Sequence, residues 1–277
     1  MTAVTVAKKD FADAIRSKVL IALATVFVLF AVGAAYVFAE YIAPTAGNRA
    51  LSTVGLIVFL LGPVGTLVPL TGLLVGYKAI VGERESGSLK FLLALPHTRR
   101  DVVLGKLLGR SGVLATAILA GFVLAAVVVV VLYSSFSASA FVGFTLLTLL
   151  FGVVFVSVGV GISGATGSAS KATALVFAFF VLFEFVWGFI PSLLLYAIEG
   201  VFFTPNPPDW YLFIANISPS SAYSNAIGLV LPANAGIQSA GNVPSVFMEP
   251  WFGLLVLLVW AAVPLAIGYY RFENADL

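Results

Sequence analysis

The chain has 277 residues, of which 61% are hydrophobic and only 9% are charged. Soluble domains are about 45–50% apolar and about 25% charged, so this composition excludes a soluble enzyme and a disordered chain. It predicts an integral membrane protein. Cysteine is absent, with one histidine and two methionines. Soft metals need a cluster of Cys, Met or His ligands, so no metal site is expected.

Six stretches are long and apolar enough to cross a bilayer core, which takes roughly 20 helical residues. The expected spans are residues 19–41, 51–77, 111–133, 140–164, 172–198 and 251–270. The second contains Pro63 and Pro69 and is expected to bend. The sequence therefore predicts an all-α protein of six transmembrane helices, with residues 1–277 forming one membrane domain.

The basic residues predict the orientation. Lys and Arg are concentrated in the cytoplasmic loops of membrane proteins. With the N-terminus in the cytoplasm, all but one of the 14 basic residues fall on that side, the exception being Arg49. We therefore expect both termini in the cytoplasm and the spans in the cell (plasma) membrane. A cleaved signal peptide is the alternative for the first stretch, but its apolar run exceeds the 7–15 residues typical of one.

Residues 4–18 have the pattern of an amphipathic helix. Apolar residues recur at three- and four-residue spacing: Val4, Ala7, Phe11 and Ile15. Charged residues occupy the other faces: Lys8, Lys9, Asp10, Asp13, Arg16 and Lys18. We expect this helix to lie in the membrane interface, with Phe11, Ile15 and Arg16 as its marker residues. The alternative is basic flanking sequence without a role of its own.

Residues 78–110 form a cytoplasmic connection that holds half of the basic residues. The helix of the second span is expected to continue to Glu85 and to stop at Gly87, because glycine accepts the left-handed conformation. Ser88 is expected to cap a short helix. Its apolar ridge would be Leu89, Leu92 and Leu93. An exposed ridge of this kind needs a protein or lipid partner, so we expect a helical hairpin that docks.

Two other helix starts can be recognised. Thr98, followed three residues later by Asp101, has the pattern of a capping box at the beginning of the third span. Ser218-Pro219 is a good N-cap and first helical residue. It lies in the connection 199–250, which has no Lys or Arg. We expect this connection to be external and to contain interfacial or re-entrant helices. The alternative is an ordered loop that only closes the outer face.

Glu184 is the single ionisable residue expected in mid-membrane. A charge there costs about 2.5–3.5 kcal/mol on the insertion scale, and such residues usually face a bundle interior or a water-filled path. Glu184 is thus a candidate for the translocation path. The alternative is a neutral carboxyl that ties helices together. Its candidate partners are the hydroxyls of Ser157, Ser163 and Ser192.

Three segments resemble one family. The first is Glu83-Arg84-Glu85-x-Gly87-Ser88-Leu89-x-x-Leu92-Leu93-x-x-Pro96-x-x-Arg99-x-x-x-x-x-x-Lys106. It resembles the coupling region of ABC-2 type permeases. The amphipathic start resembles their N-terminal interfacial helix, and Ser218-Pro219-x-x-Ala222-Tyr223 resembles the external segment before their last span. The resemblance is greatest to the branch that contains the permease of the nitrous-oxide-reductase accessory transporter, in which an acidic residue of the fifth span looks similar to Glu184.

The resemblance implies partners. In this family the permease has no ATPase of its own, and two permeases, copies or paralogues, pair with two ATP-binding subunits. ATP and Mg would be bound by those subunits, with no cofactor in this chain and no nucleic acid. The short helix at Ser88–Leu93 would enter a groove of the ATPase, supported by Glu83, Arg84 and Glu85. Two alternatives remain: a transporter or channel that works alone, and a membrane scaffold for assembly of an exported protein.

Overall fold

The computed structural model describes residues 3–15, 18–43, 52–89, 98–133, 135–232 and 245–275. These residues form helices and connecting turns, without a named strand among them. Six helical segments are long and apolar enough to cross a membrane: Leu20–Ile42, Thr53–Glu85, Arg99–Leu132, Ala138–Ala165, Ala169–Glu199 and Pro250–Glu273. The predicted all-α fold with six spans is confirmed, and the third helix begins well before its predicted apolar stretch.

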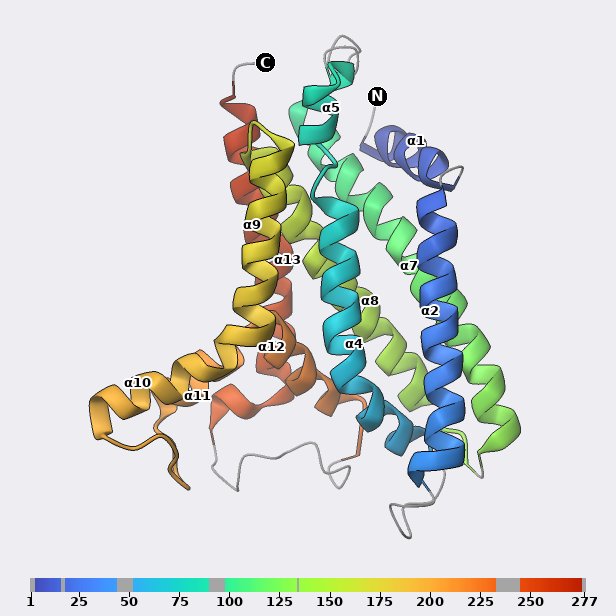
Figure 1. Cartoon of the computed structure of the whole chain (residues 1–277), viewed down its shortest axis with the longest axis vertical. Helices are drawn as coiled ribbons and strands as arrows, with labels where there is room; N and C mark the ends of the chain where they lie inside the picture. Colours follow the sequence, from blue (N-terminus) through green and yellow to red (C-terminus); the bar gives the residue numbers. More distant parts are fainter. Residues whose placement is uncertain are drawn as a thin grey trace.

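The helices follow one another as α1 (Ala3–Ile15), α2 (Lys18–Val37), η1 (Phe38–Ile42), α4 (Thr53–Gly76), α5 (Val81–Glu85), α7 (Arg99–Leu132), α8 (Ala138–Ala165), α9 (Ala169–Val181), η2 (Leu182–Val186), η3 (Trp187–Phe189), α10 (Ile190–Glu199), α11 (Asp209–Asn216), α12 (Pro219–Ala226), η4 (Ile227–Leu229), η6 (Val246–Met248) and α13 (Pro250–Glu273). The long helices run alongside one another (Figure 1). Helices α1 and α5 and the C-terminal end of α13 lie at one end, here called the α5 end.

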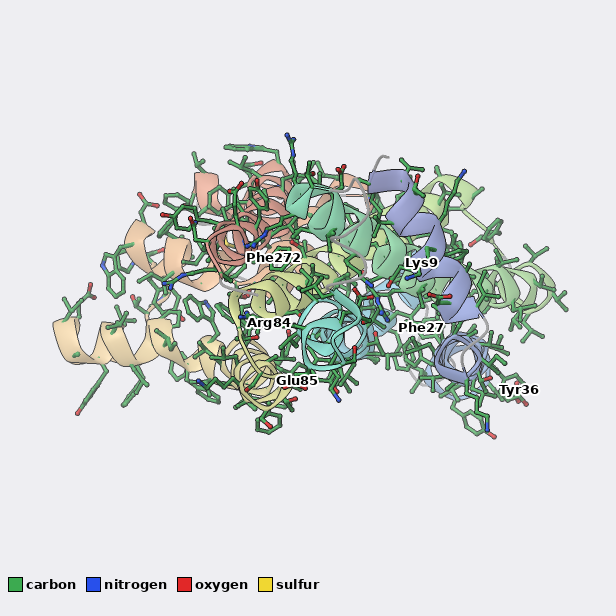
Figure 2. The ribbon with its side chains drawn as sticks, turned by 90° about the horizontal axis from the view of Figure 1, so that it is seen from above. Lys9, Phe27, Tyr36, Arg84, Glu85 and Phe272 are labelled. Carbon is green, nitrogen blue, oxygen red and sulfur yellow. The ribbon has the colours of Figure 1, made fainter. Side chains whose placement is uncertain are left out.

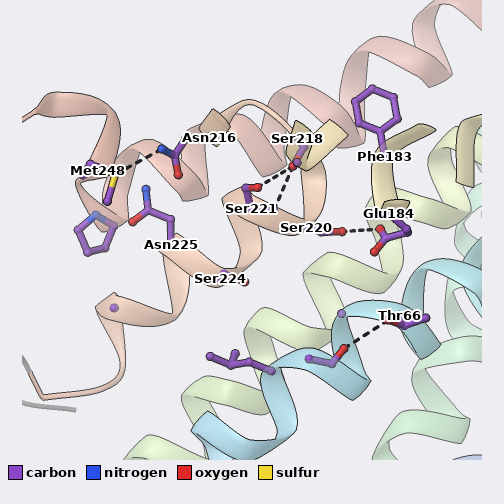
Figure 3. Close-up of a pocket in the computed structure, with 16 residues that line it drawn as sticks. Thr66, Phe183, Glu184, Asn216, Ser218, Ser220, Ser221, Ser224, Asn225 and Met248 are labelled. Atoms are coloured by element: carbon purple, nitrogen blue, oxygen red, sulfur yellow. Dashed lines mark hydrogen bonds between the residues drawn. The ribbon is translucent and has the colours of Figure 1, made fainter. Parts of the chain in front are cut away.

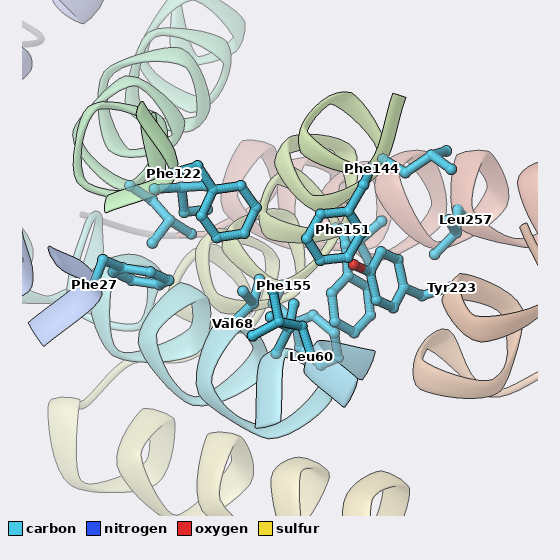
Figure 4. Packing of buried hydrophobic residues seen from close by; sticks show 14 of the residues in the cluster. Phe27, Leu60, Val68, Phe122, Phe144, Phe151, Phe155, Tyr223 and Leu257 are labelled. Atoms are coloured by element: carbon cyan, nitrogen blue, oxygen red, sulfur yellow. The ribbon is translucent and has the colours of Figure 1, made fainter. Parts of the chain in front are cut away.

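Helix α8 forms the centre of the bundle, packed against α4, α7 and α13. Its aromatic side chains Phe144, Phe151 and Phe155 are fully buried. The ring of Phe151 stacks on that of Tyr223 with centroids 4.3 Å apart (Figure 4). The hydroxyl groups of Tyr223 and Thr148 lie 2.8 Å apart. The connection before the last span is therefore part of the core at α12, because Tyr223 is inserted against α8.

Glycines permit the closest helix crossings in this bundle. A Cβ at Gly161 of α8 would collide with the Pro264 carbonyl of α13, and a Cβ at Gly268 would collide with Gly161. On the other side of α8, a Cβ at Gly76 would lie 2.8 Å from the Val156 carbonyl oxygen. The backbone of α8 thus approaches α4 and α13 directly.

Helix α1 lies across the start of α7 and contacts it through glycines. A Cβ at Gly105 would lie 2.5 Å from Val6, and one at Gly109 would lie 2.9 Å from Asp10. The buried residues of α1 are Val6, Asp10 and Ala14. The prediction that Asp10 lies off the packed face of this helix was wrong. Gly109 of α7 has no side chain and leaves room for the carboxylate, which finds cationic partners there.

The apolar residues of the predicted interfacial helix, which include the markers Phe11 and Ile15, differ in exposure. Val4 and Ile15 are 52% and 50% exposed. Phe11 is half-buried and packs near Gly112, whose Cβ would lie 3.3 Å from its ring. Arg16 lies outside the described residues.

The second span does not continue as one helix to Glu85. Helix α4 includes Pro63 and Pro69 and ends at Gly76, and α5 starts only at Val81. The buried hydroxyl oxygen of Ser163 accepts hydrogen bonds from the backbone nitrogens of Ile80 and Val81, each at 3.0 Å. The break is stable because a side chain of α8 satisfies the two amides. Thus the prediction of a continuous helix was wrong.

The predicted stop after α5 is confirmed, since Gly87 has a φ of 75°. The predicted ridge is wrong at Leu89, which is only 2% exposed and belongs to the core cluster that includes Ile80 and Val102. Leu92 and Leu93 lie outside the described residues. Leu89 is buried because the tight turn at Gly87 directs the chain back onto the bundle.

Both predicted helix starts are confirmed. Thr98 and Asp101 form a full capping box at the start of α7. Ser218 caps α12 by accepting a hydrogen bond from the Ser221 nitrogen at 3.2 Å. Beside the capping box, Arg99 donates from Nη1 to three backbone carbonyls at the end of α13, those of Phe272, Glu273 and Ala275, at 2.6, 2.7 and 2.9 Å. This arginine joins the start of the third span to the end of the sixth.

Candidate functional site

The fifth span is interrupted in its middle, at Glu184. Helix α9 ends at Val181, a π-helical turn covers Leu182–Val186, and a 3₁₀ turn follows before α10. Helix α10 then runs away from the direction of α9 (Figure 1). π-Helical turns inside α-helices occur frequently at functional sites. The interruption places the carboxylate of Glu184 beside the segment that folds back from the opposite end of the molecule.

A cavity of about 510 Å³ opens at this interruption. Its wall comes from α4, from η2 and η3, from the α11–α12 segment and from the start of α13 (Figure 3). The lining residues are Leu61, Gly62, Gly65, Thr66, Phe183, Glu184, Gly188, Asn216, Ser218, Ser220, Ser221, Ser224, Asn225, Gly228, Met248 and Pro250. Such a volume suits a small-molecule site, and hydroxyl and amide groups form part of its wall.

Glu184 is held by Ser220, whose hydroxyl donates to Oε1 at 2.5 Å. None of the three predicted serine partners bonds to it within the described part of the chain. Ser157 donates to the Ala261 carbonyl at 2.6 Å, Ser163 holds the α4–α5 break, and Ser192 lies 3.2 Å from the Tyr211 hydroxyl. The prediction failed because it considered only the spans, whereas α12 from the external connection reaches Glu184.

The amides of Asn216 and Asn225 also face this cavity. Asn216 donates from Nδ2 to the Leu212 carbonyl at 2.9 Å. Asn225 donates from Nδ2 to the carbonyls of Phe247 and Glu249, at 3.2 and 3.3 Å. These bonds fix the orientation of both amide groups, because a carbonyl oxygen can only accept.

Aromatic side chains support the cavity on the side of the fifth span. Phe183, which lines it, stacks on Trp187 with centroids 4.8 Å apart and meets Trp260 edge to face at 5.0 Å. Both indoles are fixed in turn, since Trp187 donates to the Ile214 carbonyl and Trp260 to the Ile217 carbonyl, at 2.9 and 2.8 Å. The aromatic side is thus rigid and bonded to α11.

At the α5 end, a second set of polar residues is buried. Lys106 of α7 donates to Asp10 of α1 at 2.7 Å and to Glu83 of α5 at 2.5 Å. Arg110 also pairs with Asp10, with Nε and Oδ2 2.9 Å apart. The side chains of Lys106 and Asp10 are each 5% exposed. Buried charges of this kind persist only when they are paired, so α1, α5 and α7 are joined by one ionic cluster.

The neighbouring carboxylate makes a different contact. Glu85 accepts a hydrogen bond at Oε1 from the backbone nitrogen of Ala169, the first residue of α9, at 2.7 Å. Seen from the α5 end, Arg84 and Glu85 lie beside α9 (Figure 2). Glu83 and Glu85 therefore connect one short helix to different parts of the bundle.

The residues of the predicted coupling segment differ in burial. Glu83 and Arg84 are half-buried, Glu85 and Ser88 are exposed, and Leu89 is buried. The carboxylates of Glu83 and Glu85 both contact other helices. Ser88 donates to the Glu83 carbonyl at 3.4 Å. The sequence analysis missed Asp10 and Lys106 as a buried pair. The glycines spaced four residues apart on α7 were the signal that could have revealed it.

Comparisons with known proteins agree with this architecture. A family model described as "ABC-2 family transporter protein" matches residues 4–277. The chain belongs to the ABC-2 transporter family. It is 31% identical over 269 residues to "Probable ABC transporter permease protein NosY" of Stutzerimonas stutzeri, covering 92% of this chain and 95% of the relative. The protein of the same name from Pseudomonas aeruginosa is 31% identical over 285 residues, with 99% and 98% covered.

Membership of the ABC-2 family identifies the chain as a permease subunit of an ABC transporter. It is a transport subunit rather than an enzyme, and its six apolar helices make it a multi-pass membrane protein. An ATP-binding subunit is the general partner of such permeases. The resemblance noted in the sequence is confirmed, including the NosY branch.

Proposed function

We propose that this chain is the membrane-spanning permease of an ABC exporter, with a separate ATP-binding subunit docked at its α5 end and a substrate path through the Glu184 cavity. The observation that carries the proposal is the cavity itself. The interrupted fifth span, the Glu184 carboxylate in the middle of that span and the polar α11–α12 segment meet there. Discontinuous helices of this kind form substrate sites in many transporters.

The distribution of charge supports the orientation with both termini in the cytoplasm. Basic residues of the α5 end include Arg84, Arg99, Arg100 and Arg271. The α11–α12 segment at the other end has no basic residue. By the positive-inside rule the α5 end faces the cytoplasm, where ATP is available to the partner subunit. Movement from there through the cavity is outward. The membrane in this proposal is the plasma membrane.

The docking surface in this proposal is the exposed turn after α5. Glu85, Ser86 and Ser88 are exposed there, and Gly87 provides the turn. The inward contacts of Glu83 and Glu85 would convey a displacement of this turn to α1, α7 and α9. ATP and Mg belong to the partner, and this chain contributes no cofactor.

A second permease, a copy or a paralogue, completes the proposed complex. The fifth span has its apolar side chains largely uncovered, with Phe177 and Phe189 each 68% exposed. The cavity lies beside this span, between it and α4. Pairing along the fifth span would enclose the cavity, which supports a dimer around a shared path and lipid around the remaining apolar surface.

Co-purification with an ATP-binding subunit tests the proposal. The chain is co-expressed with candidate ATP-binding subunits and isolated through a tag on the permease. Ser88→Arg would place a large charged side chain on the proposed docking surface and is expected to abolish recovery of the ATPase. Ser139→Arg changes an exposed serine at the start of α8, away from the α5 end, and should leave recovery intact.

Three outcomes would contradict the proposal. Equal recovery of the ATPase with both variants would show that the turn after α5 is not the docking surface. Substrate flux by the purified chain alone, in liposomes without ATP-binding subunits, would favour the alternative of a stand-alone transporter. A variant that still supports assembly of an exported protein after all ATP-dependent flux is lost would favour the scaffold.

A further inference from the structure

The hydrogen-bonding groups of the cavity wall are arranged so that acceptors remain for a solute. Each asparagine amide has two donor hydrogens and one acceptor oxygen. Asn216 donates from Nδ2 to the Leu212 carbonyl and to the Met248 sulfur, and Asn225 donates from Nδ2 to two backbone carbonyls. Neither Oδ1 has a hydrogen-bond donor among the described residues. Both amides are thus held in the orientation that offers their oxygens.

The hydroxyl groups follow the same pattern. Ser220 uses its hydrogen on Glu184, and Ser218 uses its hydrogen on the Ser221 hydroxyl oxygen at 2.9 Å. Thr66 donates to the carbonyl of Gly62 at 3.4 Å. Among the described residues that line the cavity, three of the five hydroxyl groups therefore already donate their hydrogen to a protein oxygen. The hydroxyls of Ser221 and Ser224 can act as donor or acceptor toward a solute.

The charge of the wall has one sign. Among the described residues that line the cavity, Glu184 is the one ionisable side chain, and none is Lys, Arg or His. Ser220 occupies Oε1, whereas Oε2 has no hydrogen-bond donor among the described residues. The Phe183 ring forms another part of the wall, and the face of an aromatic ring attracts cations. An anion would meet a carboxylate and bare acceptor oxygens here without a cationic partner.

The end of the molecule opposite α5 has the same sign. Acidic residues stand in η1, at the end of α10, at the start of α11 and before α13: Glu40, Glu199, Asp209 and Glu249. Arg49 is the one basic residue that the sequence places between α2 and α4. A surface of one sign raises the local concentration of the opposite charge. The approach to the cavity from this end thus favours cations as well.

We propose that the Glu184 cavity binds organic cations, solutes with a protonated amine whose N–H groups meet Glu184, Asn216 and Asn225. The described residues contain no group of three or more His, Cys, Asp or Glu that could hold a metal ion, and the cavity volume is large for a bare ion. These observations favour an amine over a metal. As the substrate class of the transporter, this inference rests on the proposed function; as a binding preference of the cavity, it does not.

Three probes of equal size but different charge test the preference: benzylammonium, benzyl alcohol and benzoate. Their binding to the full-length chain in lipid nanodiscs is measured by calorimetry at neutral pH. Hydrogen bonds to charged groups are clearly stronger than neutral ones, so benzylammonium should bind about tenfold or more tightly than the alcohol. Benzoate should show no binding.

Variants locate the binding. Glu184→Gln should reduce the affinity for benzylammonium to that of the alcohol. Asp13→Asn removes an exposed acid of α1, at the α5 end and outside the cavity lining, and should leave the preference unchanged. A thermal scan of each preparation accompanies the measurement. If Glu184→Gln fails to fold, the comparison of the three probes on the unaltered chain still decides the proposal.

Three results would overturn the inference: benzoate bound as tightly as benzylammonium, a preference unchanged by Glu184→Gln in a folded protein, or displacement of the amine by equimolar K⁺. Failure of the chain to bind any ATP-binding subunit would leave this test untouched and would count against the transporter proposal alone. The reverse holds as well, since an ABC permease that prefers benzoate would be a transporter with a different substrate class.

Discussion

The carboxylate of Glu85 accepts a hydrogen bond from the backbone nitrogen of Ala169, 2.7 Å away. The first amides of a helix have no partner within it, and a negative charge there is favourable. Helix α9 begins at Ala169 and leads to the interruption at Glu184. A residue of α5 thus holds the first turn of the span that carries the cavity carboxylate.

The first prediction concerns this contact. Glu85→Ala should leave ATP hydrolysis by the complex in place but lower substrate transport about tenfold, since a hydrogen bond to a charged group contributes about 1.5–3 kcal/mol. The matched control is Ser168→Ala, which removes the N-cap of the same helix at a cost of about 1 kcal/mol. Glu85→Gln retains an acceptor and should restore part of the transport. The same losses with Glu85→Ala and Ser168→Ala would mean that Glu85 only caps α9.

The second prediction concerns the ionic cluster. Lys106→Met leaves Asp10 and Glu83 without their common cation. Removal of one member of a buried ion pair costs about 3–5 kcal/mol, so the unfolding temperature in detergent should fall markedly. Lys78→Met is the control, because Lys78 is exposed over the Tyr77 ring and should change stability by only about 0.5 kcal/mol. Similar unfolding temperatures for the two variants would show that the cluster does not stabilise the fold.

The third prediction separates burial from docking. Leu89 is a core residue, so Leu89→Ala should destabilise the permease by about 2–5 kcal/mol and Leu89→Asp by more. Ser88→Arg, next to it, should change ATPase recovery without changing the unfolding temperature. Thermal unfolding of the permease without its partner distinguishes the two positions. A stable Leu89→Asp protein that fails only to recover the ATPase would contradict the burial of this side chain.

Much of the fold could be predicted because the physics of the spans is local. Six long apolar stretches, the Thr98 capping box, the Gly87 stop and the Ser218 cap each depend on residues close together in the sequence, and all are found in the structure. Family resemblance then came from a motif that includes Lys106, without showing what this lysine contacts.

The remaining features depend on residues distant in the sequence. The break between α4 and α5 is stable because Ser163, more than eighty positions away, takes up two backbone amides. The burial of Asp10 depends on its contacts with Gly109 and Lys106 of α7, about 100 positions away. Ser220 is the partner of Glu184 because the external connection folds inward. Each of these pairings joins residues that are far apart in the sequence, so the candidate site was predicted at Glu184 but without its surroundings.

The last prediction concerns Glu184 itself in transport. Glu184→Gln retains the size of the side chain and its bond from Ser220 but removes the charge, whereas Ser220→Ala removes the bond and retains the carboxylate. If the carboxylate attracts a cationic solute, Glu184→Gln should lose most substrate-stimulated ATP hydrolysis in proteoliposomes at an unchanged unfolding temperature. Ser220→Ala should keep most of it, because Oε1 is then freed for the solute. If Glu184 instead ties helices together, both variants should unfold earlier, and stimulation should fall only in proportion to the folded protein.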